Sequence, residues 1–132
     1  MALLDSRTTR LGDVLQYEDH PEYGYCRKVI TVTEAAPVVY QIGRVIGDDL
    51  DTFQDTDEFV GIYVGSPTGD NKQSIAAATP TEVVVLFRGP AGVGKANLVF
   101  GSTVNDAPKL AAALAKIEAA GIQLIEQPEQ FA

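Results

Sequence analysis

Residues 89–95, GPAGVGK, carry a pattern that is associated with phosphate chemistry. They nearly fit G-x-x-x-x-G-K-[ST], in which backbone N–H groups cradle phosphates and the lysine contacts them. The next residue is Ala96, so the hydroxyl that would hold magnesium is missing. Residues 96–103 favour an extended chain over the helix N-terminus that binds phosphate. We therefore predict a glycine-rich loop between two strands, and keep a small nucleotide-binding protein that uses Gly89 to Lys95 as an alternative.

The acidic run at 48–58 invites a comparison with calcium loops. An EF-hand loop needs oxygen ligands at alternate positions and a glycine at the sixth. Counted from Asp49, the fifth residue is Phe53 and the sixth is Gln54, so the pattern fails. The run is typical of a solvated acidic loop, and a loose calcium site is the alternative.

Catalytic constellations are not evident in the sequence. Cys26 and His20 are the only residues of their types, so neither an intrachain disulfide nor a cysteine-based metal site can form. Cys26 lies in an apolar, strand-like stretch and is expected to be a small packing residue. His20 lies in a polar stretch and is expected at the surface. No G-x-S-x-G elbow occurs, and we expect no enzymatic activity, no cofactor and no metal.

Length and charge narrow the class of protein further. A chain of 132 residues predicts one domain. Lys and Arg number 10 against 18 Asp and Glu, and the net charge of −8 should repel nucleic acid. No apolar stretch approaches the ~18 residues of a membrane span, and residues 1–5 lack the features of a signal peptide. We expect a soluble protein, made in the cytoplasm, that binds neither nucleic acid nor membranes.

The elements that must position these residues are mainly strands. β-Branched and apolar runs bounded by turn residues predict strands, and Gly43 inside the second run indicates a bulge or bend. The run at 82–87 is apolar enough to be buried on both faces. The predicted strands cover residues 26–33, 38–46, 59–64, 82–87, 96–100 and 122–125.

The hydrophobic period changes after residue 104. Asn105 or Asp106 is suited to cap a helix, and Pro108 to its first turn. Gly121 supplies a left-handed stop. The apolar residues that recur on one face of this predicted helix are Leu110, Leu114 and Ile117. The order of elements predicts an α+β fold: a β-rich single domain with one C-terminal helix followed by a short strand.

Residues 1–22 have weak periodicity and mixed polarity, which is typical of a flexible N-terminal arm. Its apolar side chains are candidates for anchoring on a partner surface, and a terminus without a role is the alternative. We expect the folded domain to cover 23–126, followed by a tail at 127–132. The candidate anchors are Leu3, Leu4, Leu11, Val14, Leu15 and Tyr17.

Several stretches follow one another in a characteristic order. They are YCRKVITV at 25–32, GRVIG at 43–47, GIYV at 61–64, VVVLFRGPA at 83–91, ANLVF at 96–100, and an alanine-rich stretch running into AGIQL at 120–124. Taken together, they resemble the phage head-decoration proteins, the lambda-type capsid stabilisers. The resemblance spans about residues 23–125, and RGPA at 88–91 is its strongest piece.

The resemblance implies a capsid decoration protein that binds the major capsid protein as a homotrimer. It would lie on the outer capsid surface of the virion and stabilise the shell. The arm would order on docking and add to capsid-protein strands. Arg88, Gly89 and Pro90 are the candidates for trimer contacts, whereas residues 48–58 match the family poorly. A soluble adaptor domain unrelated to virions is the alternative from another class.

Overall fold

The computed structural model describes residues 14–18, 26–70 and 72–125. Within these ranges the chain is β-rich, with one α-helix followed by a short strand, as the sequence predicts. The strands are β1 (Leu15–Glu18), β2 (Arg27–Val32), β3 (Val38–Gln41), β4 (Val45–Gly47), β5 (Phe59–Gly65), β6 (Lys72–Ile75), β7 (Thr81–Leu86), β8 (Ala91–Gly94) and β9 (Ile122–Ile125). The helices are the 3-10 helix η2 (Lys95–Asn97) and the α-helix α3 (Ala107–Ala119).

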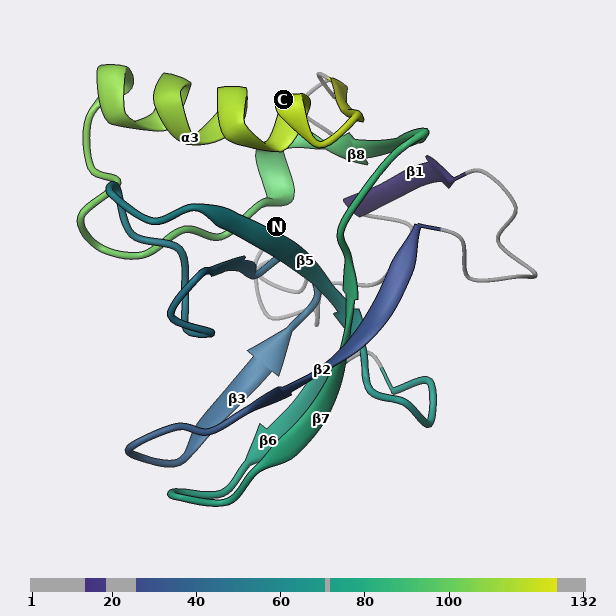
Figure 1. The fold of residues 1–132 in the computed structure, drawn as a ribbon, viewed down its shortest axis with the longest axis vertical. Helices are drawn as coiled ribbons and strands as arrows, with labels where there is room; N and C mark the ends of the chain where they lie inside the picture. Colours follow the sequence, from purple (N-terminus) through teal and green to yellow (C-terminus); the bar gives the residue numbers. More distant parts are fainter. Residues whose placement is uncertain (1–13, 19–25, 71, 126–132) are drawn as a thin grey trace, which may run out of the picture.

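A four-stranded antiparallel sheet in the order β2–β7–β5–β4 runs through the centre of the fold (Figure 1). Tyr63 of β5 lies opposite Val85 of β7, and both side chains are fully buried. Ile62 lies opposite Leu86, and both are buried as well. Successive residues of a strand point to opposite faces, so the middle of this sheet is covered on both sides. The predicted burial of both faces of 82–87 is confirmed there.

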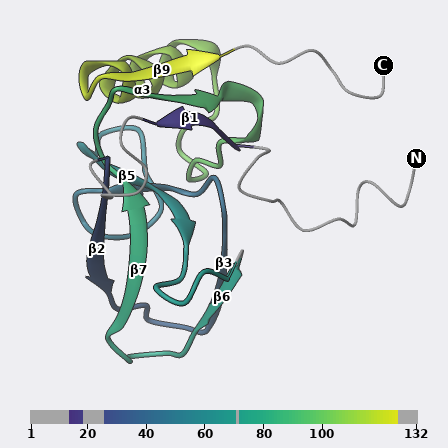
Figure 2. The same cartoon turned by 90° about the vertical axis from the view of Figure 1, so that its right-hand side faces the viewer.

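A second layer lies across one end of that sheet (Figure 2). It contains the three-stranded sheet β1–β8–β9, in which β8 is antiparallel to β1 and parallel to β9. Helix α3 packs against β9 and β5. Leu114 and Ile117 of α3 are buried, as expected, whereas Leu110 is exposed.

The ends of α3 match the signals in the sequence. The Asp106 side chain accepts a hydrogen bond from the Lys109 backbone N–H at 2.9 Å, which satisfies one of the donors left unpaired at a helix start. Gly121 has φ +89°, a conformation that glycine adopts readily, and it ends the helix. The chain then turns directly into β9, as predicted.

The predicted strand at 38–46 divides at Gly43, which has φ +105°. A Cβ there would collide with the carbonyl oxygen of Asn97. Before the bend, β3 pairs with β6, and after it β4 pairs with β5. Strand β6 was not predicted because its sequence, KQSI, lacks an apolar pattern.

The structure contradicts three of the predictions, two about residues 91–100 and one about residues 14–18. Residues 91–94 form strand β8 where a loop was expected. Residues 96–100 do not form a strand, because η2 takes up their start and only Val99 makes an isolated bridge, to Arg44. Residues 14–18, assigned to the flexible arm, belong to the fold: Val14 is fully buried and β1 pairs with β8.

Candidate binding surface

The structure does not arrange residues 89–95 as a phosphate loop. Strand β8 lies between β1 and β9, so its backbone groups are engaged in two ladders, and all four of its residues are buried. Lys95 begins a three-residue 3-10 helix, so no α-helix N-terminus follows the glycines. The segment is therefore a central strand, and its N–H groups are not grouped around an anion site.

The candidate trimer residues connect β7 to β8. The Gly89 backbone N–H donates to the Ala120 carbonyl oxygen at 3.0 Å, and a Cβ on Gly89 would collide with the carbonyl oxygen of Gly121. Arg88 and Pro90 are exposed, and the Arg88 guanidinium lies 4.9 Å from the centre of the Phe87 ring. The half-buried Gly89 thus joins two connections of the chain, while its two neighbours are exposed.

The candidate anchors of the arm fall into different environments. Val14 is fully buried in the core of the domain, so its side chain is not available to a partner in this conformation. Leu15 is half-buried in β1, and Tyr17 lies in the same strand. Leu3, Leu4 and Leu11 lie outside the described residues, as do the tail at 127–132 and His20.

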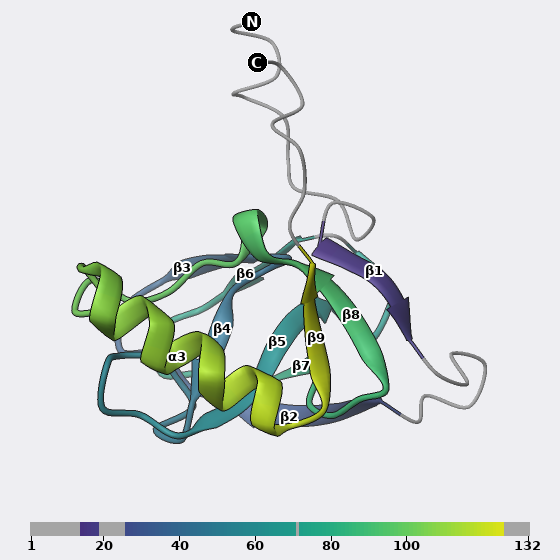
Figure 3. The ribbon, with the colours of Figure 1, turned by 90° about the horizontal axis from the view of Figure 1, so that it is seen from above.

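The first and last strands of the described fold lie on either side of β8, and the chain enters β1 and leaves β9 at the same end of the three-stranded sheet (Figure 3). Leu15 of β1 is the partner of Val93, and Ile125 of β9 is the partner of Gly94, the next residue of β8. Two strand spacings of about 4.8 Å separate β1 from β9, so the chain enters and leaves the fold roughly 10 Å apart. The same end of the sheet carries η2, which begins at Lys95.

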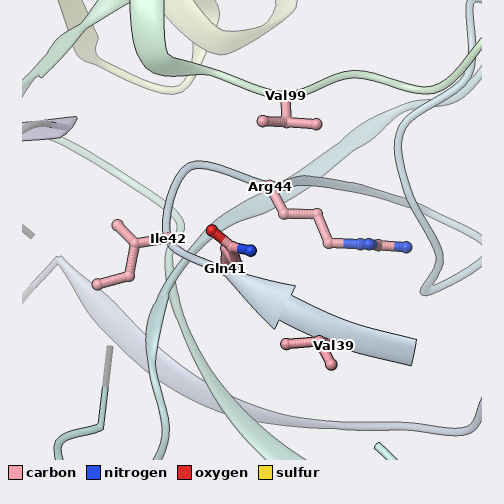
Figure 4. A pocket seen from close by; sticks show the side chains of 5 residues that line it. All are labelled: Val39, Gln41, Ile42, Arg44 and Val99. Carbon is pink, nitrogen blue, oxygen red and sulfur yellow. The ribbon is translucent and has the colours of Figure 1, made fainter. Parts of the chain in front are cut away.

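A pocket of about 290 Å³ opens close to this end of the molecule, between β3 and the segment after η2 (Figure 4). Val39 and Val99 face one another across it and are 48% and 51% exposed. Gln41, Ile42 and Arg44 complete its lining. The sequence did not single out these residues, although the bend at Gly43 marks the place where Ile42 and Arg44 meet.

Arg44 is the charged residue of the pocket. Its guanidinium lies 4.3 Å from the centre of the Tyr40 ring and 3.5 Å from an Asp51 carboxylate oxygen, and its side chain is 18% exposed. The Nε atom is buried and has no hydrogen-bond partner among the described residues. Buried donors are nearly always paired, so this N–H is an exception among the buried polar groups of the described residues.

The acidic loop at 48–58 is tied down rather than freely solvated. Phe53 is fully buried and packs edge-to-face on Phe100, with ring centres 6.0 Å apart. The Lys116 ammonium of α3 donates to the Asp57 carbonyl oxygen at 2.6 Å. In the part of the chain that the structure describes, no group of three or more His, Cys, Asp or Glu side chains could hold a metal ion.

Two buried tyrosines, Tyr40 and Tyr63, pack with their rings edge-to-face and their ring centres 5.5 Å apart. The Tyr40 hydroxyl donates to a Glu34 carboxylate oxygen at 2.6 Å, and burial together with this carboxylate raises the pKa of Tyr40. Burial, aided by the charge of Asp70, raises the pKa of Tyr63 to about 12. Both groups therefore stay neutral at ordinary pH and serve the packing of the core.

No family model, curated protein or solved structure matches the chain. Among the described residues, no helix is long and apolar enough to cross a membrane.

Proposed function

We propose that this chain is a phage head-decoration protein, which binds the outer surface of the capsid as a homotrimer and stabilises the shell. The proposal combines the ordered resemblance across residues 23–125 with the way in which the chain enters and leaves the fold. Decoration is a binding function without a catalytic step. It requires a rigid body and segments that attach this body to another surface.

The common exit of the two terminal segments carries the proposal. Residues 1–13 and 126–132 join the described fold at the same end of β8. Fully extended, they would span at most about 45 Å and about 24 Å. Two segments that start roughly 10 Å apart, at the same end of one sheet, can contact one underlying surface together.

A homotrimer would place three such pairs of segments on one surface, and multivalent attachment raises the overall affinity without new contacts. Arg88 and Pro90 are the proposed trimer contacts because both are exposed. The net charge of −8 suits a coat protein that is repelled by the packaged genome. By contrast, no arrangement of residues 89–95 favours the nucleotide-binding alternative, since β8 is a paired strand.

Binding to expanded, undecorated heads of the parent phage tests the proposal. We expect saturable binding at local three-fold positions, seen by electron microscopy, and decorated heads that rupture at a higher temperature than bare ones. A protein that leaves these heads bare at saturating concentration would count for the adaptor alternative.

A deletion of residues 1–10 sharpens this test, because it spares Val14 and β1, which belong to the fold. We expect it to abolish head binding while the melting temperature of the isolated protein stays unchanged. Deletion of 127–132 is the matched control for the other segment and should weaken binding less, because that segment is shorter. Full occupancy without residues 1–10 would show that the arm is not the anchor.

A further inference from the structure

The pocket between Val39 and Val99 is suited to an apolar side chain. These two valines are among the few large apolar side chains that are exposed in the described part of the chain. Covering them would remove apolar surface from water, at about 25 cal/mol per Å². The buried Arg44 Nε at the same pocket lacks an acceptor among the described residues. An occupant that brings both an apolar group and an oxygen acceptor would satisfy both features.

The N-terminal segment of the same chain starts next to this pocket. A Cβ on Gly43 would lie 3.2 Å from Val14 Cγ2, and Gly43 is the residue between Ile42 and Arg44. The Val99 N–H, on the other wall, donates to the Gly43 carbonyl oxygen at 2.8 Å. Val14 therefore touches the backbone that carries both walls of the pocket.

Leu11 is the apolar residue of the segment that is closest to this point in sequence. Val14 lies three positions further along the chain, and an extended chain covers roughly 10 Å over that length. Leu3 and Leu4 are much further along the chain, and Gly12, between Leu11 and Val14, allows a sharp change of direction.

We propose that Leu11 of the same chain docks between Val39 and Val99, and that a backbone carbonyl oxygen of its segment accepts a hydrogen bond from Arg44 Nε. The docked leucine fixes the direction in which residues 1–10 leave the domain. Leu3 and Leu4 are then the leucines left for a partner surface. Only this last assignment rests on the proposed function, because the docking itself is a property of the isolated chain.

Thiol labelling of a Val39→Cys variant of the full chain tests the docking in solution. Cys26 is buried, so the new thiol is the accessible one. We expect Leu11→Ser in the Val39→Cys background to raise the labelling rate about fivefold. The reason is that Leu11 would cover the thiol in most molecules, and serine at this position would leave it uncovered. Leu4→Ser is the matched control and should leave the rate unchanged. Equal rates in both variants would overturn the proposal.

A thermal double-mutant cycle provides the second measurement. We expect Leu11→Ser to lower the melting temperature by about 4 °C, and to have a much smaller effect once Val99→Ser has removed one wall of the pocket. Additive effects would show that Leu11 and Val99 do not touch. Labelling protection that grows with protein concentration would assign the pocket to the segment of a second copy and would also overturn docking within one chain. Neither measurement involves capsids, so failure here is distinct from failure to bind heads.

Discussion

The two main sheets of this protein are built from opposite kinds of sequence. The four-stranded sheet uses runs of β-branched and aromatic residues, such as TEVVVL in β7, whose faces fill the core. The three-stranded sheet has AGVG as its central strand and takes its neighbours from distant parts of the chain. Strong local patterns thus build the four-stranded sheet, whereas close backbone approach helps to build the three-stranded sheet, from whose other end both terminal segments leave.

The close approach is concentrated where two connections cross. The link from β7 to β8 and the link from α3 to β9 touch at Gly89 and Gly121, with a backbone hydrogen bond from Gly89 to Ala120 beside them. In the four-stranded sheet, by contrast, cohesion comes from side chains that alternate between two buried faces. The comparison therefore predicts different sensitivities to mutation. The three-stranded sheet should be sensitive to changes that disturb backbone contacts, and the four-stranded sheet to changes in side-chain volume.

Gly89→Ala should have the largest effect. The added Cβ collides with the Gly121 carbonyl oxygen, so the backbone must shift, and we expect the free energy of unfolding to fall by about 3 kcal/mol. Urea denaturation measures this change. Gly69→Ala is the control: Gly69 has φ +93° but nothing within 4 Å of its Cβ position, so only the conformational cost of about 1 kcal/mol applies. Similar losses in the two variants would mean that the contact at Gly89 is not tight.

Val93→Ala and Val85→Ala form a matched pair across the two sheets, since both side chains are fully buried. Each should cost about 2 kcal/mol. We expect Val93→Ala to speed amide exchange about thirtyfold in β1 and β9 while β2 and β7 keep their protection. Val85→Ala should speed exchange throughout the domain. Uniform exchange in Val93→Ala would show that the sheets unfold as one unit and would remove the distinction.

Alkaline pH should weaken the four-stranded sheet through Tyr63. Its pKa is raised to about 12 in the folded protein from the ordinary value of 10.0, so the folded state binds its proton more tightly than the unfolded state does. The stabilisation is complete below pH 10 and is lost as pH rises toward 12, by roughly 2–3 kcal/mol. Denaturation midpoints between pH 9 and 12 measure the slope. Tyr63→Phe should reduce the slope without removing it, because the pKa of Tyr40 is raised as well. A slope that is unchanged in this variant would assign the loss to other groups.

Asp106→Ala should give the smallest change, because it removes a helix cap at the surface of the second layer. Loss of the hydrogen bond to the Lys109 N–H should cost about 1 kcal/mol. Asp106→Asn keeps an acceptor oxygen and should be nearly neutral in the same thermal melt. If the alanine variant melts like the asparagine variant, the cap is not a determinant of α3.

The predictable part of the fold is the part with local signals. Strands at 59–64, 82–87 and 122–125 follow from apolar runs, and α3 from Asp106, Gly121 and the repeat between them. Strand β8 was not predictable, because glycine and alanine have weak strand propensity and its burial depends on pairing with β1 and β9. Strand β1 was not predictable for the same reason, because it depends on pairing with β8, where Leu15 lies opposite Val93.

The candidate site was predicted less well than the fold. The sequence indicated apolar residues near the N-terminus as candidate anchors for a partner. It could not show which of them belong to the core of the domain and which lie at its surface. Val14 is a core residue because its side chain packs against the backbone at Gly43, which has no side chain of its own. That contact joins residues that are 29 positions apart in the sequence. No sequence pattern predicted the pocket. Val39 and Val99 lie in stretches that were predicted as ordinary strands, and only the fold brings their side chains face to face.

Leu15 and Ile125 lie at the same end of the three-stranded sheet, and this arrangement also determines how the domain bears load. If both terminal segments are held by one surface and the body is pulled away from it, β1 and β9 are drawn in the same direction along β8. Shear of this kind stretches the hydrogen bonds of both ladders at once, whereas pulling apart the two adjacent chain ends of a hairpin opens its bonds one after another. The three-stranded sheet would thus resist a force that pulls the body away from a surface holding both terminal segments.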